Sequence, residues 1–472
     1  MGHAARLFNS VAEQTLHARV TPSDEQLEFL REQWNSLAEH LKSDLAAQCG
    51  FPVSTWLQGS YKYATLIKPV HKGERYDVDL GVYFEWDPKQ QDAEPAPRQL
   101  RDWVQRALRT YQSRTPGLTE VVEPAKDRCS RAIYGQQFHI DTPTYHLDPR
   151  RDRRRLAHLS RGWEERDPKP LYQWFKTVTE GKDRDQMRRL IRYLKAWAAV
   201  EFRSAPDARP SSVLLSVLVA DAYTTFGKQL ERLWERPDDD DALAGVVRAI
   251  QERLLDSAKV PNPIDRNEDL NRISAEHWDP FLSRLQTLLD AADAAQAAPD
   301  EVTAALAWSQ AFAFLMPLPD EEEVEVVSSG GRALMVLPEI RIDVHARKPR
   351  RHLATHLNGV PGVARDCDLV FTITNPHVVP DYATIEWTVR NAGRDADGVG
   401  DLGHRRSGTG LFTAEEKTRY VGRHHMDCVV RVNGQVYAVR RVPVVVRDAA
   451  YPGAVAVASP PWRRLRSARR RT

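Results

Sequence analysis

The 472-residue sequence predicts an α+β chain that ends in a smaller all-β domain. Up to about residue 325, segments of alternating apolar residues are mixed with segments in which apolar residues recur every three or four positions. From about residue 335 to 450 the alternating, β-branched pattern prevails, with turn signals such as Asn433-Gly434 between the strands. A chain of this length is too long for a single core, so two or three domains are expected.

The elements of the first part follow from this periodicity. A long helix is predicted over 22–48, because Pro22 suits a first turn and large apolar residues then recur at spacings of three and four. A strand-rich segment follows over 53–148 and is interrupted by a helix at 98–110. Further helices are predicted at 168–178, 184–203, 211–233, 242–258, 276–296 and 301–314.

The domain boundaries follow from shifts in composition. The first unit is predicted to span 1–325, and Pro317 and Pro319 end its last helix. Polar and small residues make 326–334 a linker, and 335–450 is expected to form a β-sandwich that folds separately. Residues 451–472 form a tail with six arginines, which could meet an acidic partner or nucleic acid, or serve as a solubilising end.

Charge and composition exclude several classes of protein. The formal net charge is only +2, so bulk charge does not mark a nucleic-acid binder. The longest apolar run, Val213 to Ala220, is far too short to span a membrane. The four cysteines are scattered, which is typical of buried free thiols in a reducing compartment and predicts a cytoplasmic protein.

The most informative motif is a Gly-Ser pair followed by two alternating aspartates. Gly59-Ser60 ends a predicted strand, and Asp77 and Asp79 lie in the run Tyr-Asp-Val-Asp-Leu-Gly-Val. Period-two alternation puts both carboxylates on one face of a strand, where a divalent cation, best Mg²⁺, would relieve their repulsion. The glycine lets backbone N–H groups approach phosphate oxygens. Alone, either half could be a solvated face or a plain turn; together they predict a nucleotidyl-transfer site.

A third acid is expected, because the attacking hydroxyl must lose a proton near the metal. Asp141, in the alternating segment Gln137 to Pro143, is the candidate, and its alternative role is a turn residue at a strand end. Asp148 is the fallback.

Gly59-Ser60, Asp77-x-Asp79 and Asp141 together resemble the catalytic core of the cGAS/DncV-like nucleotidyltransferases (CD-NTases). The similarity extends over about residues 22–316 and includes Thr65, Leu194-Lys195-Ala-Trp197, Pro210-Ser211-Ser212 and Pro261-Asn-Pro263-Ile-Asp265. It implies a polymerase-β-like core with a helical lobe. It also implies two Mg²⁺ ions, with Mn²⁺ as an alternative, held by Asp77, Asp79 and Asp141. Nucleotide phosphates would be bound by Gly59, Ser60, Lys195 and Ser212. From sequence alone, Lys195 could equally lie on a solvated helix face.

The C-terminal segment resembles the adenylyl/guanylyl and SMODS C-terminal sensor domain (AGS-C). The similarity is carried by Phe371 to Pro376, Tyr382 to Gly393, Thr418 to His424, and Asn433-Gly434. The family's Leu-Arg-Gly segment reads Leu402-Gly403-His404 here. The resemblance implies a regulatory ligand, and a structural or ligand-contact role is expected for His404, His424 and His425.

The resemblance implies synthesis of a cyclic di- or oligonucleotide from ATP or other NTPs, with release of pyrophosphate, in bacterial anti-phage (CBASS) signalling. A downstream effector would bind the product. Two alternatives remain: a linear nucleotidyltransferase acting on RNA or protein, and a nucleotide-sensing module. The arginines at 150–155 are expected to form a solvated loop, although they could contact triphosphate or nucleic acid.

Overall fold

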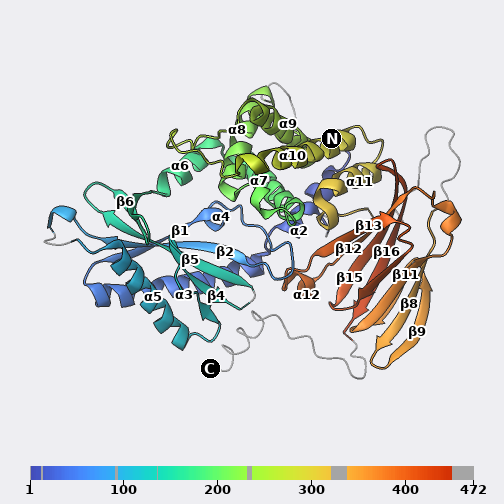
Figure 1. The fold of residues 1–472 in the computed structure, drawn as a ribbon, viewed down its shortest axis with the longest axis horizontal. Coiled ribbons are helices and arrows are strands. Elements are labelled where there is room, and N and C mark those ends of the chain that lie inside the picture. Colours follow the sequence, from blue (N-terminus) through green and yellow to red (C-terminus); the bar gives the residue numbers. More distant parts are fainter. Residues whose placement is uncertain are drawn as a thin grey trace.

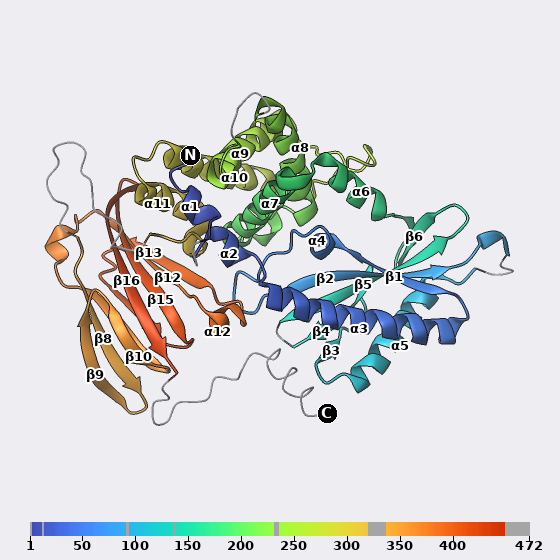
Figure 2. The ribbon, with the colours of Figure 1, turned by 180° about the vertical axis from the view of Figure 1, so that it is seen from behind.

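The computed structural model describes residues 2–11, 14–90, 94–135, 137–230, 236–319 and 337–448. They form three parts: a mixed sheet at the left of Figure 1, a helical lobe at the top and a β-sandwich at the right. Figure 2 shows the same arrangement from behind, with the N-terminal helices packed beside the helical lobe. None of the described helices has the length and apolar composition needed to cross a membrane.

The mixed sheet carries the predicted acidic residues. Its described strands have the order β1-β2-β5-β4-β3, with β6 paired to β5 and β7 to β6. Only β2 and β5 run parallel to each other; the other pairs are antiparallel. The strands are β1 (Val53–Gln58), β2 (Tyr76–Glu85), β3 (Glu120–Val121), β4 (Cys129–Tyr134), β5 (Phe138–Asp148), β6 (Arg153–His158) and β7 (Gly162–Glu165).

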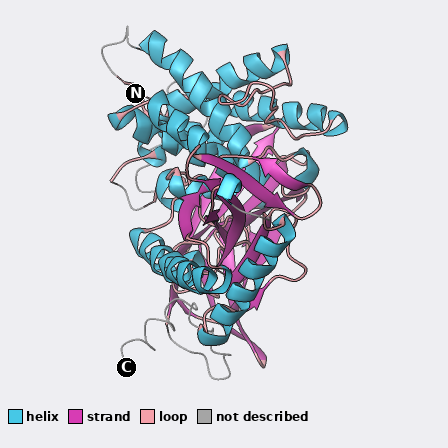
Figure 3. Ribbon diagram, turned by 90° about the vertical axis from the view of Figure 1, so that its left-hand side faces the viewer, coloured by secondary structure: helices cyan, strands magenta, loops and turns pink. Residues whose placement is uncertain are grey.

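Helices α3 (Asp24–Cys49) and α5 (Pro97–Arg114) cover one face of this sheet (Figure 2). Ser23 and Gln26 form a capping box at the start of α3. Val78, Leu80 and Val82 of β2 are fully buried in the core that these helices share with the sheet. The polar residues that alternate with them therefore face the helical lobe, and Figure 3 shows the strands between the two groups of helices.

The helical lobe lies over the other face. Its core includes Trp197, Trp308 and Phe8, and the rings of Phe8 and Trp308 are 5.2 Å apart. The helices of this lobe and the short helices near it are α1 (Ala5–Phe8), α2 (Leu16–Val20), α4 (Gly59–Lys62), α6 (Lys169–Val178), α7 (Gly181–Glu201), α8 (Ser212–Leu230), α9 (Asp239–Asp256), α10 (Ala275–Gln296), α11 (Glu301–Phe312) and the 3₁₀ turns η2 (Pro206–Ala208) and η3 (Ala313–Leu315). A further 3₁₀ turn, η1 (Pro88–Gln90), follows β2 of the mixed sheet.

The C-terminal part is a sandwich of two sheets. The described strands form one sheet in the order β10-β16-β15-β12-β13 and a second in the order β14-β11-β8-β9. Trp387 and Phe371 pack between them, and the Trp387 indole donates to the Leu411 carbonyl. The elements are β8 (Ile340–Arg347), β9 (Arg350–Leu357), β10 (Val360–Ala364), β11 (Cys367–Ile373), η5 (Pro376–Val378), β12 (Thr384–Arg390), α12 (Arg394–Asp397), β13 (Gly403–Thr409), β14 (Thr413–Lys417), β15 (Gly422–Val432) and β16 (Gln435–Arg447).

A buried layer of charge joins the sandwich to the helical lobe. The Arg390 guanidinium is 4% exposed, pairs with Asp427 and donates to the Met316 carbonyl at 2.7 Å. Arg405 donates to the Ser309 carbonyl, and Arg19 donates to the Phe314 carbonyl at 3.0 Å. These arginines therefore bind the backbone where α11 and η3 end.

The predicted α+β class and the C-terminal sandwich are confirmed, and the predicted helices differ from the observed ones by a few residues at their ends. The predicted linker at 326–334 and tail at 451–472 lie outside the described residues. Apolar residues of the sandwich, Leu402 and Val429, also belong to the core of the helical lobe.

The prediction of a solvated arginine loop at 150–155 is wrong for its second half. Residues Arg153–His158 form β6, and the Arg154 side chain is 1% exposed, with ion pairs to Asp152 and Asp167. Arg155 pairs with Glu94. The sequence pattern hid this strand because arginine stems can be buried while their charges are paired with carboxylates.

Candidate active site

The acidic residues of β2 and β5 lie side by side on one face of the mixed sheet. The parallel register places Asp79 opposite Asp141 and Asp77 opposite His139. Because side chains alternate along both strands, all four point to the face that the helical lobe covers. The structure therefore brings Asp77, Asp79 and Asp141 together, although Asp77 and Asp141 are 64 residues apart in the chain.

His139 is a fourth member of this cluster that the sequence analysis missed. Its Nε2 lies 2.8 Å from Asp77 Oδ1. Asp77, His139 and Asp141 offer ligand atoms that all lie within 4.8 Å of one another, which suits a metal ion. The signal was present, because His139 and Asp141 are two residues apart in an alternating segment and so share a face.

Asp79 lies in an environment that disfavours its charge. Burial, and then the neighbouring Asp77 and Asp141, raise the pKa of Asp79 to about 7. Gly59 packs directly on this carboxylate: a Cβ at Gly59 would lie 2.0 Å from Asp79 Oδ2, and its φ of +60° also favours glycine. A cation beside Asp79 would favour the ionised carboxylate.

Asp141 is held in its ionised form by basic neighbours. Arg131 donates to its two oxygens through Nε at 2.5 Å and Nη2 at 2.7 Å, and Lys126 Nζ lies 3.7 Å away. Burial alone would raise the pKa of Asp141, but the hydrogen bonds and charge of Arg131 outweigh it and hold this pKa below its usual value. Arg131, which the sequence analysis also missed, faces Asp141 on the antiparallel neighbour β4.

Asp148, the fallback for the third acid, lies elsewhere. Its carboxylate accepts hydrogen bonds from the backbone of Arg150 and Arg151 and so holds the turn after β5.

Lys195 is buried inside the molecule, not on a solvated helix face. Its Nζ donates to the backbone and side-chain oxygens of Thr65, both at 3.1 Å, and the residue is 5% exposed. Burial, and then the positive charge of Arg192, lower the pKa of Lys195 to about 7. The segment after Gly59-Ser60 is thereby tied to α7.

A cavity of about 320 Å³ adjoins the acidic cluster, and residues predicted to bind nucleotide phosphates lie in its wall. Ser60, Asp77, Lys195 and Ser212 all line it. Ser211 Oγ accepts from the Leu214 N–H and so caps α8, and the Ser212 side chain remains beside the cavity. The cationic side chains in its lining are Lys68, Arg75, Lys195 and Arg209, a set that suits an anionic ligand.

The comparisons with known proteins identify both halves of the chain. The model of the DncV-like cyclic GMP-AMP synthase nucleotidyltransferase domain matches residues 53–145. The model of the adenylyl/guanylyl and SMODS C-terminal sensor domain matches residues 328–447. A cyclic GMP-AMP synthase of Escherichia albertii is 29% identical over 441 residues, which is 93% of this chain and 94% of that protein.

Other relatives match a smaller share of the chain. A cyclic GMP-AMP synthase of Vibrio cholerae is 23% identical over 211 residues, covering 35% of this chain and 47% of that protein. The crystal structure of the Vibrio cholerae DncV cyclic AMP-GMP synthase superposes with a TM-score of 0.55 at 16% identity, covering 68% of this chain and 98% of that one. The Escherichia coli DncV structure bound to 3'-deoxy GTP gives a TM-score of 0.54 at 19% identity, with 66% and 96% covered.

The structural likeness establishes the fold, and the two domain models confirm the resemblance that the motifs predicted. The chain therefore carries a segment similar to the DncV-like nucleotidyltransferase domain and, after it, a segment similar to the adenylyl/guanylyl and SMODS C-terminal sensor domain.

Proposed function

We propose that this protein joins nucleoside triphosphates, ATP among them, into a cyclic di- or oligonucleotide and releases pyrophosphate. One observation carries the proposal: the cluster of Asp77, His139 and Asp141 adjoins a cavity with cationic side chains in its wall. Lys195 and Ser212 line this cavity together with Asp77. A relative that covers 93% of this chain is a cyclic GMP-AMP synthase, which supports cyclic products over linear ones.

The acidic cluster fits Mg²⁺, or Mn²⁺ as an alternative. Asp77, Asp79 and Asp141 supply hard carboxylate oxygens. Burial and the neighbouring carboxylates raise the pKa of Asp79, and a bound divalent cation would offset that repulsion. His139 could add a nitrogen ligand, which Mn²⁺ accepts more readily than Mg²⁺. When bound, such ions neutralise the triphosphate and make the attacking 2′- or 3′-hydroxyl more acidic.

The chain's own residues would bind and orient the substrate. The Lys195 ammonium, held against Thr65, is placed to meet phosphate oxygens at the cavity wall, and the Ser60 and Ser212 hydroxyls can donate to the same group. Gly59 lets its backbone approach Asp79 and the phosphates together. Arg131 keeps Asp141 ionised, so that this carboxylate remains a ligand at neutral pH.

A linear transferase that acts on RNA would need an open basic groove, and the arginines near 150 do not supply one. Arg150 pairs with Asp87, Arg153 with Glu165, and Arg154 and Arg155 with the acids described above. The charges of these four arginines are therefore balanced within the protein, which favours small nucleotide substrates.

The product assay separates these possibilities by stoichiometry. Purified full-length protein is incubated with α-labelled NTPs and Mg²⁺ or Mn²⁺, and the products are treated with phosphatase. A cyclic product resists phosphatase and releases one pyrophosphate per NTP incorporated. A linear dimer retains its 5′-triphosphate, is phosphatase-sensitive and releases one pyrophosphate for two NTPs; that result would overturn the cyclic proposal.

Lys195 should make triphosphate binding depend on pH. Its pKa of about 7 means that the ammonium is charged below pH 7 and increasingly neutral above it. If the charged form binds phosphate, affinity for a non-hydrolysable NTP analogue should be flat below pH 7 and fall by up to about tenfold per pH unit above it. Calorimetric titration from pH 6 to 9 measures this.

The matched control is Lys195→Met, which keeps the length of the side chain without its charge. Its affinity should be lower and should lack the slope above pH 7, apart from the ligand's own titration. Parallel slopes in both proteins would assign the pH dependence to another group.

The wider role is proposed from the family resemblance: the product would bind a downstream effector in bacterial anti-phage (CBASS) signalling. We place this activity in the cytoplasm, where NTPs are available and where free thiols persist; Cys49, Cys129, Cys367 and Cys428 are all free.

A further inference from the structure

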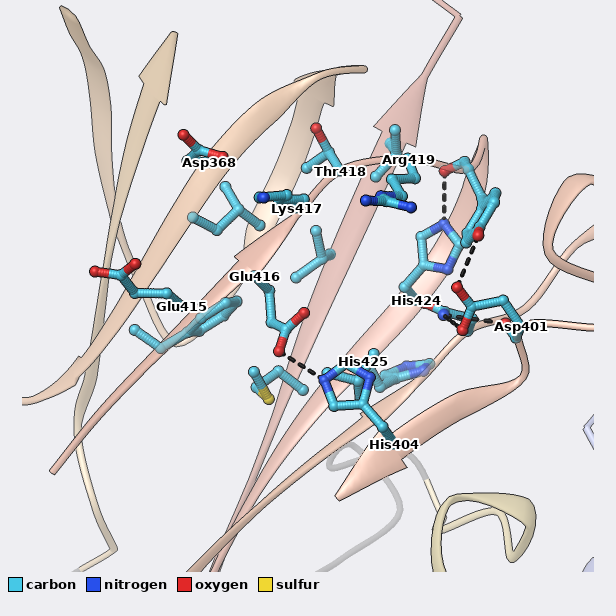
Figure 4. Close-up of a pocket in the computed structure, with 18 of the residues that line it drawn as sticks. Asp368, Asp401, His404, Glu415, Glu416, Lys417, Thr418, Arg419, His424 and His425 are labelled. Carbon is cyan, nitrogen blue, oxygen red and sulfur yellow. Dashed lines mark hydrogen bonds and ion pairs between the residues drawn. The ribbon is translucent and has the colours of Figure 1, made fainter. Parts of the chain in front are cut away.

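A second cavity, of about 650 Å³, lies between the two sheets of the sandwich and is far larger than the cavity at the acidic cluster (Figure 4). Its volume falls within the range of about 300–1,000 Å³ that is typical of small-molecule sites. Strands β11, β13, β14, β15 and β16 contribute to its lining. Leu369, Phe371 and Met426 give it an apolar wall. None of the residues assigned to nucleotidyl transfer lines it.

Two of the four acidic groups that line this cavity have partners among its other lining residues. His404 Nε2 lies 2.7 Å from Glu416 Oε1, and Tyr420 donates to Asp401 Oδ2 at 2.7 Å, as the dashed lines in Figure 4 show. His424 accepts from the Ala392 N–H through Nδ1, so its Nε2 carries the proton that it donates to the Tyr420 carbonyl. A third acid of the lining, Asp368, lies 3.5 Å from the Arg347 guanidinium, and the fourth, Glu415, is exposed. The lining also holds five lysine and arginine side chains, one more than its acids.

Cationic side chains surround the mouth. Lys72, Arg350, Arg406 and Lys417 are exposed and line the cavity, and none of the four forms an ion pair within the part of the chain that the structure describes. Arg419 is also exposed at the cavity, beside Lys417 (Figure 4). Unpaired cations at a mouth favour an anion, and phosphate oxygens are strong acceptors for lysine and arginine.

A ligand must satisfy both the apolar wall and the polar groups. An aliphatic chain would leave the His404 and Glu416 pair without polar contacts, and a sugar alone would leave Phe371 and Met426 uncovered. A planar heterocycle offers apolar faces and a hydrogen-bonding edge. We propose that this cavity is a second nucleotide site, which takes the base between the sheets and the phosphate at Lys417 and Arg419.

The cavity is joined to the catalytic half by one segment of chain. Lys72 of that half contributes to the cavity lining. Four residues earlier, Lys68 is 6% exposed and forms an ion pair at 2.8 Å with Asp397 of α12 in the sandwich. Pro69 packs against Gly400, where a Cβ would lie only 3.0 Å from the Pro69 Cβ.

The same segment reaches the acidic cluster. It begins at Thr65, which holds Lys195, and ends at Asp77. Between them, His71 Nε2 lies 3.0 Å from the Ala199 carbonyl of α7, the helix that carries Lys195. A ligand that draws Lys72 into the cavity would move the segment that positions both groups, so occupancy of the second site regulates nucleotidyl transfer.

Met426 provides a probe that does not depend on catalysis. The sequence has five methionines, and of the three within the described residues Met426, which is 2% exposed, is the one that lines this cavity. Full-length protein labelled with [¹³C-methyl]methionine is titrated, without divalent metal, with AMP, GMP, CMP and UMP, with the four nucleosides and with inorganic phosphate. Met426→Leu assigns the signal.

We expect a saturable shift of the Met426 methyl signal with at least one monophosphate, and at least about tenfold weaker binding of its nucleoside and of phosphate alone. Lys417→Glu/Arg419→Glu should weaken that monophosphate at least about tenfold, while Arg351→Glu, an exposed residue of β9 outside the lining, should not. An unmoved Met426 signal with all four monophosphates, or equal affinity in the charge-reversed variant, would overturn the site.

Regulation by the second site is tested separately, through the rate of product formation, and this test rests on the proposed transfer activity. The monophosphate that binds should change the rate of product formation in the wild type, and this change should be lost in Lys417→Glu/Arg419→Glu while the basal rate persists. An equal change in both proteins would place the effect at the catalytic cavity and contradict the coupling. Because the Met426 signal needs no turnover, failure of the second site is distinguishable from failure of the proposed activity.

Discussion

Replacement of Asp77 and Asp79 together by asparagine should lower product formation at least about a thousandfold. The change keeps the size of both side chains but removes the charge that a divalent cation needs, and metal-held stabilisation of the transition state is worth several kcal/mol. Product formation is measured as pyrophosphate release from NTPs. Asp148→Asn is the matched control, because this acid holds the turn after β5 and should leave the rate within a few fold.

The same variant should not lose stability, which separates a site defect from misfolding. The folded-state pKa of Asp79 is raised to about 7, so its charge costs stability increasingly as pH rises from about 4 to 7, and the full cost remains above 7. Without metal at pH 8, the melting temperature of the Asp77→Asn/Asp79→Asn protein should therefore equal or exceed that of the wild type. Added Mg²⁺ should raise the melting temperature of the wild type only. Near-wild-type turnover in the variant would refute the assignment of this cluster.

Asp427→Ala should destabilise the protein by about 3–5 kcal/mol. Asp427 is fully buried, pairs with Arg390 and lies 3.8 Å from the Arg441 guanidinium. Removing the carboxylate leaves buried guanidinium charge without its counter-ion, which is the costly way to break such a pair. Chemical denaturation of the full chain, followed separately for the sandwich and the helical lobe, measures the loss.

Two further variants identify the cause of this loss. In Arg390→Met/Asp427→Leu both charges are removed, so much of the stability should return, although the Met316 carbonyl loses its donor. Glu165→Gln breaks an ion pair with Arg153 whose side chains are both more than half exposed, and it should cost less than about 1 kcal/mol. A loss from Asp427→Ala no larger than that from Glu165→Gln would show that the buried layer contributes little.

Most of the architecture could be predicted from local patterns, because the spacing of apolar residues within a segment indicates whether that segment is a helix or a strand. The alternation in Tyr76–Glu85 specified a strand with Asp77 and Asp79 on one face, and the three- and four-residue spacing specified α3 and α7. The change of period near residue 335 specified the sandwich. Each of these signals is contained within one element.

Contacts between elements could not be predicted in the same way. The approach of His139 to Asp77 depends on the parallel register of β2 and β5, and the clamp of Arg131 on Asp141 depends on the pairing of β4. The burial of Lys195 depends on Thr65, 130 residues away in the chain. Arg154 looked solvated because its partner Asp167 lies on a later segment. The neighbouring sequence does not indicate whether a long polar side chain is buried, because its partners lie on other segments.

The arginines that bind the backbone at the end of α11 make the end of this helix depend on the sandwich. Arg390 and Arg405 come from the sandwich and Arg19 from the N-terminal helices. Together they donate to the carbonyl groups of Met316, Ser309 and Phe314, at the end of the last helix and of the 3₁₀ turn after it. The sandwich thus completes the last helix of the catalytic half. In a protein with an exchanged sandwich, these contacts would form only if the incoming domain brought guanidinium groups to the same carbonyls. The interface that would have to be matched holds none of the residues assigned to nucleotidyl transfer.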